Sequence, residues 1–255
     1  MNIKAVFLII VILFCFAQNY AEIRTIHVYV ALCDNIHQKI VEVPARFGNG
    51  QKAEGNLYWG SGGGMRTFFR RSEEWDEVTV IKNPSDIILE RVIFKHKTSN
   101  VYLMADAYDG AEIKQTITDF FQACNGTLQA SVSIDTISLD FAGKADLIAY
   151  IGHDWLMDFD LDLAITPDNS QPRDALILSC ISKTYFADNL RKTGAEPLLW
   201  TTGLMAPEAY TLKAALDGWM LNENNDQIKE RAAQAYNNYQ HCGIGSARNL
   251  LVTGW

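Results

Sequence analysis

The sequence predicts a single α/β domain with a mostly parallel central sheet and helices on both faces, a three-layer arrangement. Two short apolar runs, Leu147–Ile151 and Ala175–Leu178, have the length of buried strands and lack the polar alternation of half-exposed ones. Strand-like and helix-like segments alternate along the chain, as they do in proteins with parallel sheets. The 255 residues contain no internal repeat and no Pro/Gly-rich linker, so we expect one domain over residues 22–255.

Composition excludes several classes of protein. Apolar residues make up 48% of the chain, which is typical of a well-packed globular protein and argues against disorder. The net charge is −8 and no basic stripe occurs, so we expect no nucleic-acid partner. The basic pair Arg70-Arg71 is followed by acidic residues and is interpreted as a solvated helix end.

Residues 1–21 are typical of a secretory signal peptide. Lys4 is followed by the apolar run Ala5–Phe16, whose 12 residues are too few to span a bilayer comfortably. Cleavage after Ala17 and cleavage after Ala21 both fit the sequence. We expect an exported protein, periplasmic or extracellular, with no stable membrane insertion after signal cleavage. An uncleaved N-terminal anchor is the alternative.

The expected elements justify the α/β assignment in order. Residues 36–56 are expected to form a long loop, which in compact domains is often functional. The expected strands are Arg24–Leu32, Val78–Ile81, Ile87–Lys95, Val101–Ala105, an edge strand or hairpin within Thr127–Asp140, Leu147–Ile151, Ala175–Leu178 and Glu196–Thr202. The expected helices are Met65–Trp75, Asp109–Ala123 with a cap in Asp106–Asp109, Ser182–Lys192, Pro207–Asn222, Gln227–Gln240 and Ser246–Val252.

The glycine-dense stretch Leu57–Gly64 invites comparison with a phosphate-binding loop. It lacks the Gly-Lys-Ser/Thr ending and an immediately preceding strand, so nucleotide binding is disfavoured. Two interpretations of the stretch remain. It is a flexible turn into a helix, or a backbone passage that needs glycine near a pocket.

Polar residues follow three of the expected strands. His153 follows one apolar run, Ser179 and Cys180 follow the next, and Asp34 and Asn35 follow the first strand. Parallel strands bring their carboxyl ends to one sheet edge, where open α/β sheets bind ligands. A histidine near a cysteine can take the thiol proton and later protonate a leaving group. The pair alone fits a buried core thiol at Cys180 and a strand-capping histidine at His153 better than a catalytic pair. We carry His153 and Cys180 as candidate catalytic residues because of the wider order of elements. Asp34, Asn35 and Ser179 are the residues expected in a substrate pocket.

This order of elements resembles the caspase-like cysteine peptidase clan, which includes caspases, legumains, gingipains and clostripain. That clan has an apolar strand followed by His-Gly, then an apolar strand followed by a small residue and Cys. The resemblance covers roughly Val101–Trp219 and implies that His153 is the general base and Cys180 the nucleophile. It also implies that backbone N–H groups near Cys180 and at Asp154 stabilise an oxyanion. This chain differs in having Asp154 after the histidine, with Gly152 before it, and Ser179 before the cysteine.

The remaining cysteines and acidic residues leave alternatives open. Cys33, Cys124, Cys180 and Cys242 follow the signal, and an exported protein with four cysteines could form two disulfides, or at most one if Cys180 is a nucleophile. Asp158, Asp160 and Asp162 alternate, which predicts one face of a strand: a solvated edge, a Ca²⁺ site or a surface that selects basic substrates. No paired-Cys or His-x-x-x-His spacing occurs, so we expect no metal and no cofactor.

Two functions fit the sequence. The first is an exported cysteine endopeptidase acting on a peptide or protein substrate through an acyl-thioester on Cys180. The second is a non-catalytic exported binding or interaction protein on the same scaffold.

Overall fold

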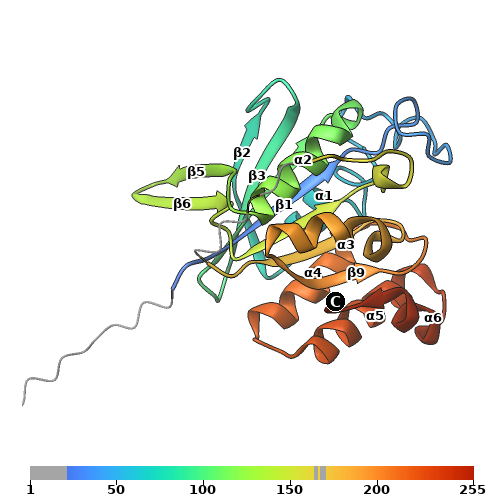
Figure 1. Cartoon of the computed structure of the whole chain (residues 1–255). Coiled ribbons are helices and arrows are strands. Elements are labelled where there is room, and N and C mark those ends of the chain that lie inside the picture. The colour runs from blue at the N-terminus through green and yellow to red at the C-terminus, as the bar shows by residue number, and fades with distance from the viewer. Residues whose placement is uncertain (1–21, 164–165, 167–170) are drawn as a thin grey trace, which may run out of the picture.

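The computed structural model describes residues 22–163, 166 and 171–255. The expected signal peptide, residues 1–21, lies outside the described residues. An eight-stranded sheet runs through the described chain (Figure 1). In spatial order its strands are β10 (Leu251–Val252), β9 (Glu196–Thr201), β8 (Asp174–Leu178), β7 (Leu147–Ile151), β1 (Arg24–Ala31), β4 (Val101–Tyr108), β3 (Ile88–His96) and β2 (Trp75–Lys82).

The five strands from β9 to β4 run parallel, and the pairings of β10 with β9, β3 with β4 and β2 with β3 are antiparallel. The prediction of an α/β chain with a mostly parallel sheet is therefore confirmed. The helices are α1 (Met65–Arg70), α2 (Ile113–Cys124), α3 (Ser182–Thr193), α4 (Ala209–Met220), α5 (Asn225–Gln240) and α6 (Ile244–Leu250), with short 3₁₀ turns at η1 (Gly110–Glu112) and η2 (Trp155–Met157).

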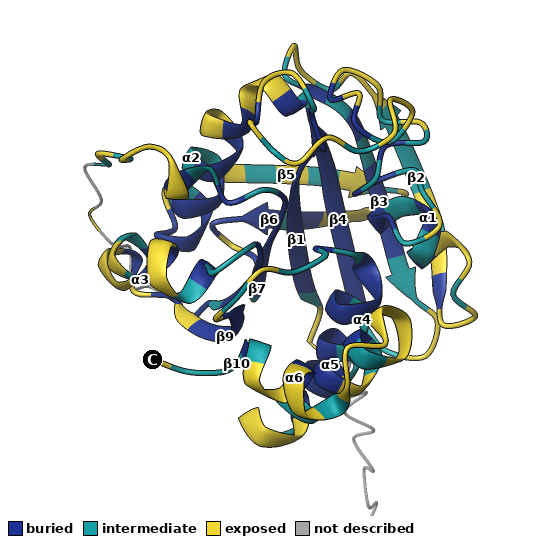
Figure 2. Cartoon of the chain, turned by 90° about the vertical axis from the view of Figure 1, so that its right-hand side faces the viewer, coloured by how far each residue is buried: buried dark blue, intermediate teal, exposed yellow. Residues whose placement is uncertain are grey.

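The burial of both faces of strand β1 explains why its sequence is continuously apolar. Val28 and Val30 pack into one hydrophobic cluster with residues of α1, α4 and α5. Tyr29 and Ala31, which point the other way, pack into a second cluster with residues of α2 and α3. A strand covered on both faces has no solvated side and so no polar alternation. Figure 2 shows β1 and β4 as buried strands in the middle of the molecule.

The hairpin within Thr127–Asp140 is confirmed as β5 (Gln129–Ile134) and β6 (Ile137–Ala142), a separate two-stranded sheet. It projects from the side of the large sheet (Figure 1). Leu139 and Phe141 on β6 pack in a third cluster with Ile93 and Met104. One side of the hairpin is thus covered, which accounts for its alternating sequence.

Three expected helices extend too far at their C-terminal ends, among them Pro207–Asn222, whose counterpart α4 ends at Met220. The helix expected over Met65–Trp75 ends at Arg70, and Trp75 instead begins β2. The Trp75 ring is buried and packs 5.5 Å, centroid to centroid, from Phe69, so tertiary packing outweighs helix propensity there. The helix expected to reach Val252 ends at Leu250, because Leu251 pairs with Thr201 to extend the sheet.

Four expected helix starts were also shifted. Helix α2 begins at Ile113 rather than Asp109, α5 at Asn225 rather than Gln227, and α6 at Ile244 rather than Ser246. Helix α4 begins at Ala209 rather than at Pro207. Asp106 does not cap a helix but lies buried inside β4, and Asp109 alone caps, accepting a hydrogen bond from the Ala111 N–H at the start of η1.

Asp106 is instead the centre of a buried charged cluster. Its carboxylate accepts hydrogen bonds from Arg91 Nε and Nη2 at 2.6 and 2.7 Å, and lies 3.1 Å from His27 Nε2. Burial alone raises the pKa of Asp106, but the hydrogen bonds from Arg91 and His27 outweigh it and keep the pKa below its ordinary value. Burial lowers the pKa of His27. Asp106 and Arg91 therefore form an ion pair across the neighbouring strands β4 and β3.

We expect Asp106→Asn to lower the free energy of unfolding by about 3 kcal/mol, because it leaves Arg91 without its charged partner in a buried site. The measurement is urea denaturation at pH 7. Asp140→Asn is the control, since Asp140 is about half exposed in its pair with Lys144 and should change stability by less than about 0.5 kcal/mol. Equal losses in the two variants would contradict the role assigned to the cluster.

Candidate active site

His153 and Cys180 leave the sheet from neighbouring parallel strands. Strands β7 and β8 pair with Ile151 opposite Leu178, and the Gly152 N–H donates to the Leu178 carbonyl at 3.3 Å. Each of the two candidate residues follows its strand by two positions. Both line one cavity of about 360 Å³. The structure thus brings the predicted pair to one site at the carboxyl edge of the sheet, the edge at which open α/β sheets bind ligands.

The cavity is built by loops that follow four strands of the parallel sheet and by the glycine-dense stretch. Residues of the loop after β1 form one wall, and Leu204, Met205 and Pro207 after β9 form another. The other lining residues are Lys39, Ile40, Val41, Val43, Tyr58, Gly152 and Met157. Most of these side chains are apolar.

The Cys180 thiol is partly buried and held by backbone. Its Sγ lies 3.5 Å from the Met205 nitrogen and 3.7 Å from the Met205 oxygen. Burial raises the pKa of Cys180, the Met205 N–H lowers it and the Asp154 carboxylate raises it further, with a net upward shift. The resting group at neutral pH is a thiol rather than a thiolate.

The His153 ring is also kept in its neutral form. Burial lowers its pKa, so the imidazole is neutral at neutral pH. Its Nε2 is buried and has no hydrogen-bond partner among the described residues. Tyr150 Oη donates to the His153 carbonyl at 2.8 Å and fixes the backbone. No hydrogen bond joins the ring to Cys180 within the described ranges, as is frequent in sites without substrate.

A tight approach explains why glycine precedes the histidine. A Cβ atom at Gly152 would lie 2.8 Å from Tyr150 Oη and 3.0 Å from the Ala31 Cβ. Any larger residue would displace the tyrosine that holds the His153 backbone.

The residue after the cysteine is in a strained conformation. Ile181 has φ 50° and ψ 29°, a left-handed conformation that costs a residue with a Cβ about 1–2 kcal/mol and is rarest for β-branched side chains. Its N–H donates to the Gly203 carbonyl at 2.9 Å, and its carbonyl accepts from Thr184 at the start of α3. The backbone N–H groups of Cys180 and Asp154 have no acceptor among residues 22–163, 166 and 171–255. Strain of this kind concentrates at functional sites.

The residues expected in the substrate pocket lie elsewhere. Asp34 is buried and accepts hydrogen bonds from the Ile36 and His37 N–H groups at 2.8 and 3.1 Å. The Asn35 side chain bonds both the N–H and the carbonyl of Val43, at 3.1 and 2.7 Å. Neither lines the cavity, but together they shape the loop that does.

Ser179 is fully buried at the end of β8, and its hydroxyl has no partner among the described residues. It does not line the cavity.

Asp154 carries an unusual carboxyl group. Its side chain is completely buried, one oxygen accepts from the Leu156 N–H at 3.0 Å, and the other has no partner in the described structure. Burial raises the pKa of Asp154 from 3.8 to about 7. Its charge, when present, raises the pKa of Cys180.

Sequence reasoning missed Tyr58, which lines the cavity beside Cys180. The Leu57–Gly64 stretch folds back tightly, because a Cβ at Gly64 would lie 2.5 Å from the Trp59 carbonyl carbon and one at Gly60 would collide with Gly55. The interpretation as a backbone passage that requires glycine is therefore confirmed. The available signal was an aromatic residue within a run of glycines.

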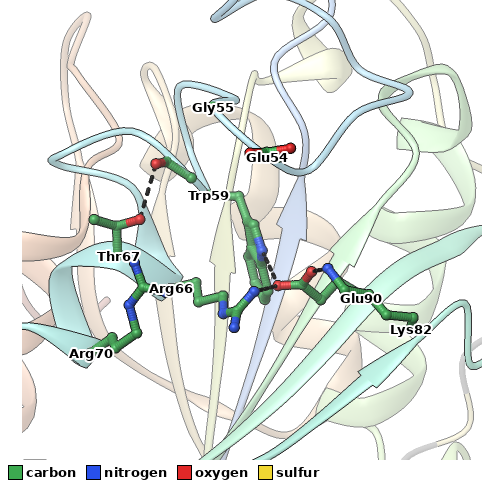
Figure 3. Close-up of a pocket in the computed structure, with 9 residues that line it drawn as sticks. Glu54, Gly55, Trp59, Arg66, Thr67, Arg70, Lys82 and Glu90 are labelled. Carbon is green, nitrogen blue, oxygen red and sulfur yellow. Dashed lines mark hydrogen bonds and ion pairs between the residues drawn. The ribbon is translucent and has the colours of Figure 1, made fainter.

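The next residue, Trp59, lines a different cavity of about 370 Å³. Figure 3 shows its indole and Arg66 converging on Glu90, with hydrogen bonds of 2.9 and 2.6 Å, while Lys82 pairs with the same carboxylate. The cations in this second cavity are largely neutralised by acids, since Arg66 also pairs with Glu77. The hydrogen bond from Trp59 to Glu90 on β3 holds the glycine-dense stretch against the sheet.

The alternating acids do not share a strand face. Asp158 closes η2, and residues 159–163 have no regular secondary structure. The Phe159 ring stacks on Trp155 at 4.3 Å between centroids. No group of metal-binding side chains occurs within the described ranges. The four cysteines of the described chain, Cys33, Cys124, Cys180 and Cys242, are free thiols, so neither proposed disulfide pattern is present.

No known protein family, curated protein or solved structure matches this chain.

Asp154→Asn should stabilise the protein at high pH only. The folded carboxyl ionises near pH 7 and the unfolded one near 3.8, so the folded state binds more protons between these values and loses stability as pH rises through them. The asparagine keeps the oxygen that accepts from Leu156 and removes the charge. We expect equal stability near pH 3.5 and a gain of up to roughly 4 kcal/mol at pH 8, measured by urea denaturation. Asp158→Asn, at an exposed neighbour, is the control, and a gain independent of pH would contradict the assignment.

Proposed function

We propose that this protein is an exported cysteine peptidase of the caspase-like type, a single three-layer domain in which Cys180 is the nucleophile and His153 the general base. The observation that carries the proposal is the shared cavity. One thiol and one imidazole from adjacent parallel strands line the same cavity at the carboxyl edge of the sheet.

The resemblance of chain order supports the same proposal. In the caspase-like clan the histidine follows one apolar strand and the cysteine the next, and here β7 and β8 are those strands. Helix α3 follows the cysteine and strand β9 follows the helix, as the resemblance requires.

The chemistry proceeds from a neutral pair. A peptide carbonyl enters the cavity, and Cys180 Sγ attacks its carbon while a ring nitrogen of His153 takes the thiol proton. The unpaired N–H group of Cys180 is the donor for the resulting oxyanion. The Asp154 N–H, expected to be a second donor, belongs to a fully buried residue that does not line the cavity. The C–N bond then breaks, the amine leaves with the proton from His153, and water hydrolyses the acyl-thioester. Because burial disfavours both charged forms, proton transfer accompanies the attack rather than preceding it.

A non-catalytic binding protein is the second candidate. The upward shift in the pKa of Cys180, together with the lack of a His153–Cys180 hydrogen bond among the described residues, favours it. On this reading the cavity binds a partner and the thiol is one of its lining groups.

Alkylation separates the two candidates. We expect iodoacetamide at pH 7.5 to modify Cys180 faster than the buried Cys33 and Cys124, and His153→Asn to slow Cys180 about tenfold by removing its base. Peptide mapping by mass spectrometry gives the rate at each cysteine, and the exposed Cys242 serves as the internal reference.

His241→Asn is the matched control, because His241 is exposed at the end of α5 and asparagine tolerates its left-handed φ of 53°. Cleavage of an unfolded protein substrate should disappear in Cys180→Ala. Labelling of Cys180 that ignores His153, with no cleavage, would leave the binding protein as the function.

Export is part of the same proposal. The positive Lys4 and the apolar run after it support a cleaved signal. No helix among the described residues is long and apolar enough to cross a membrane. We expect the secreted protein to begin at Gln18 or Glu22, as determined by N-terminal sequencing. Retention of residue 1 would favour an anchor instead.

A further inference from the structure

We propose that the cavity beside Cys180 selects an apolar side chain on the substrate residue whose carbonyl is attacked. This inference rests on the proposed function and gives it a substrate class: peptides cut after residues such as leucine, methionine or phenylalanine.

The chemistry of the walls supports this selection. Ile40, Val43 and Met205 are partly buried apolar residues of the walls that also pack against the core. No carboxylate lines the cavity in the described structure, so a lysine or arginine side chain would lose its hydration without gaining a partner. The expectation that nearby aspartates select basic substrates is not supported by this lining.

The one charged side chain that lines the cavity in the described structure lies at its mouth. Lys39 is exposed, and its Nζ is 5.0 Å from the centroid of the Phe159 ring. A bound carboxylate is usually recognised by a planar bidentate arginine or by several donors, and the described walls offer neither. An acidic side chain would therefore gain one solvated contact and lose the rest of its hydration.

The size of the cavity and its rim fit one apolar side chain. At about 360 Å³ it is near the lower end of ligand pockets, which is room for a single side chain rather than an extended ligand. Val41 and Leu204 stand at the mouth with 92% and 72% of their surfaces exposed. Exposed apolar residues gathered at the mouth of a cavity indicate a surface that is covered on binding.

The test uses three peptidyl chloromethyl ketones that are identical except for a final leucine, aspartate or lysine. Cys180 Sγ forms a bond to the methylene carbon, chloride leaves with the bonding electrons, and the thiol proton passes through His153 to solvent. We expect the leucine reagent to label Cys180 about 100-fold faster than the other two, because neither charged group finds a partner in the cavity.

A matched pair of variants locates the selectivity. Leu204→Asp should slow labelling by the leucine reagent about tenfold and speed labelling by the lysine reagent, since it adds a carboxylate at the mouth. Leu221→Asp is the control, because Leu221 is also largely exposed, at 65%. It follows α4 directly after Met220, whose carbonyl accepts a hydrogen bond from Arg24. Arg24 begins β1, so Leu221 lies at the end of the sheet opposite to the cavity. The control substitution should change neither rate.

The outcomes separate the two proposals. If labelling of Cys180 depends on His153 but is as fast with the aspartate or lysine reagent as with the leucine reagent, the apolar selectivity is contradicted and the His153–Cys180 pair is supported. Labelling that prefers leucine but ignores His153 would support the pocket and overturn the peptidase. Leucine selectivity unchanged in Leu204→Asp would overturn the assignment of the cavity as the selecting site.

Discussion

The candidate site depends on the parallel pairing of β7 with β8. Ile151 opposes Leu178, so the segments that carry His153 and Cys180 emerge at the same height of the same sheet edge. Because side chains alternate between faces with a period of two, a shift of one residue would turn one of the two groups to the other face of the sheet. Both strands are buried on both faces except at Asp174, and that burial fixes the register.

The site is also where the chain departs from ordinary local preferences. Ile181 adopts a conformation that glycine favours, and Asp154 and Ser179 bury polar atoms that have no partner among the described residues. Each departure costs free energy, and such costs persist in a fold when the surrounding packing over-determines the conformation. Here the surroundings are two hydrophobic clusters on either side of β7 and β8. Local strain, unpaired buried groups and a cavity coincide at one edge, which is the pattern of a functional site rather than of a passive surface.

The sequence was sufficient for those parts of the fold that depend on continuous burial or clear periodicity. The runs Leu147–Ile151 and Ala175–Leu178 are apolar because both faces are covered, and β8 begins only one residue earlier than expected. It was insufficient where a contact distant in sequence decides. Trp75 begins a strand because it pairs with His96, and Asp106 is buried because Arg91 forms an ion pair with it from the neighbouring strand.

The site was predictable to the same extent. Strand ends placed His153 and Cys180, because parallel neighbours share an edge. They could not show that Asn35 shapes a loop through Val43, nor that Tyr58 lines the cavity together with Cys180. Both depend on how irregular backbone folds back on itself, which has no periodic signature. A resting thiol and a neutral imidazole follow from the same burial that makes the cavity apolar. On the proposed function, reactivity and selectivity have one physical origin: partial burial disfavours a preformed thiolate–imidazolium pair, and apolar walls offer no partner to a charged substrate side chain.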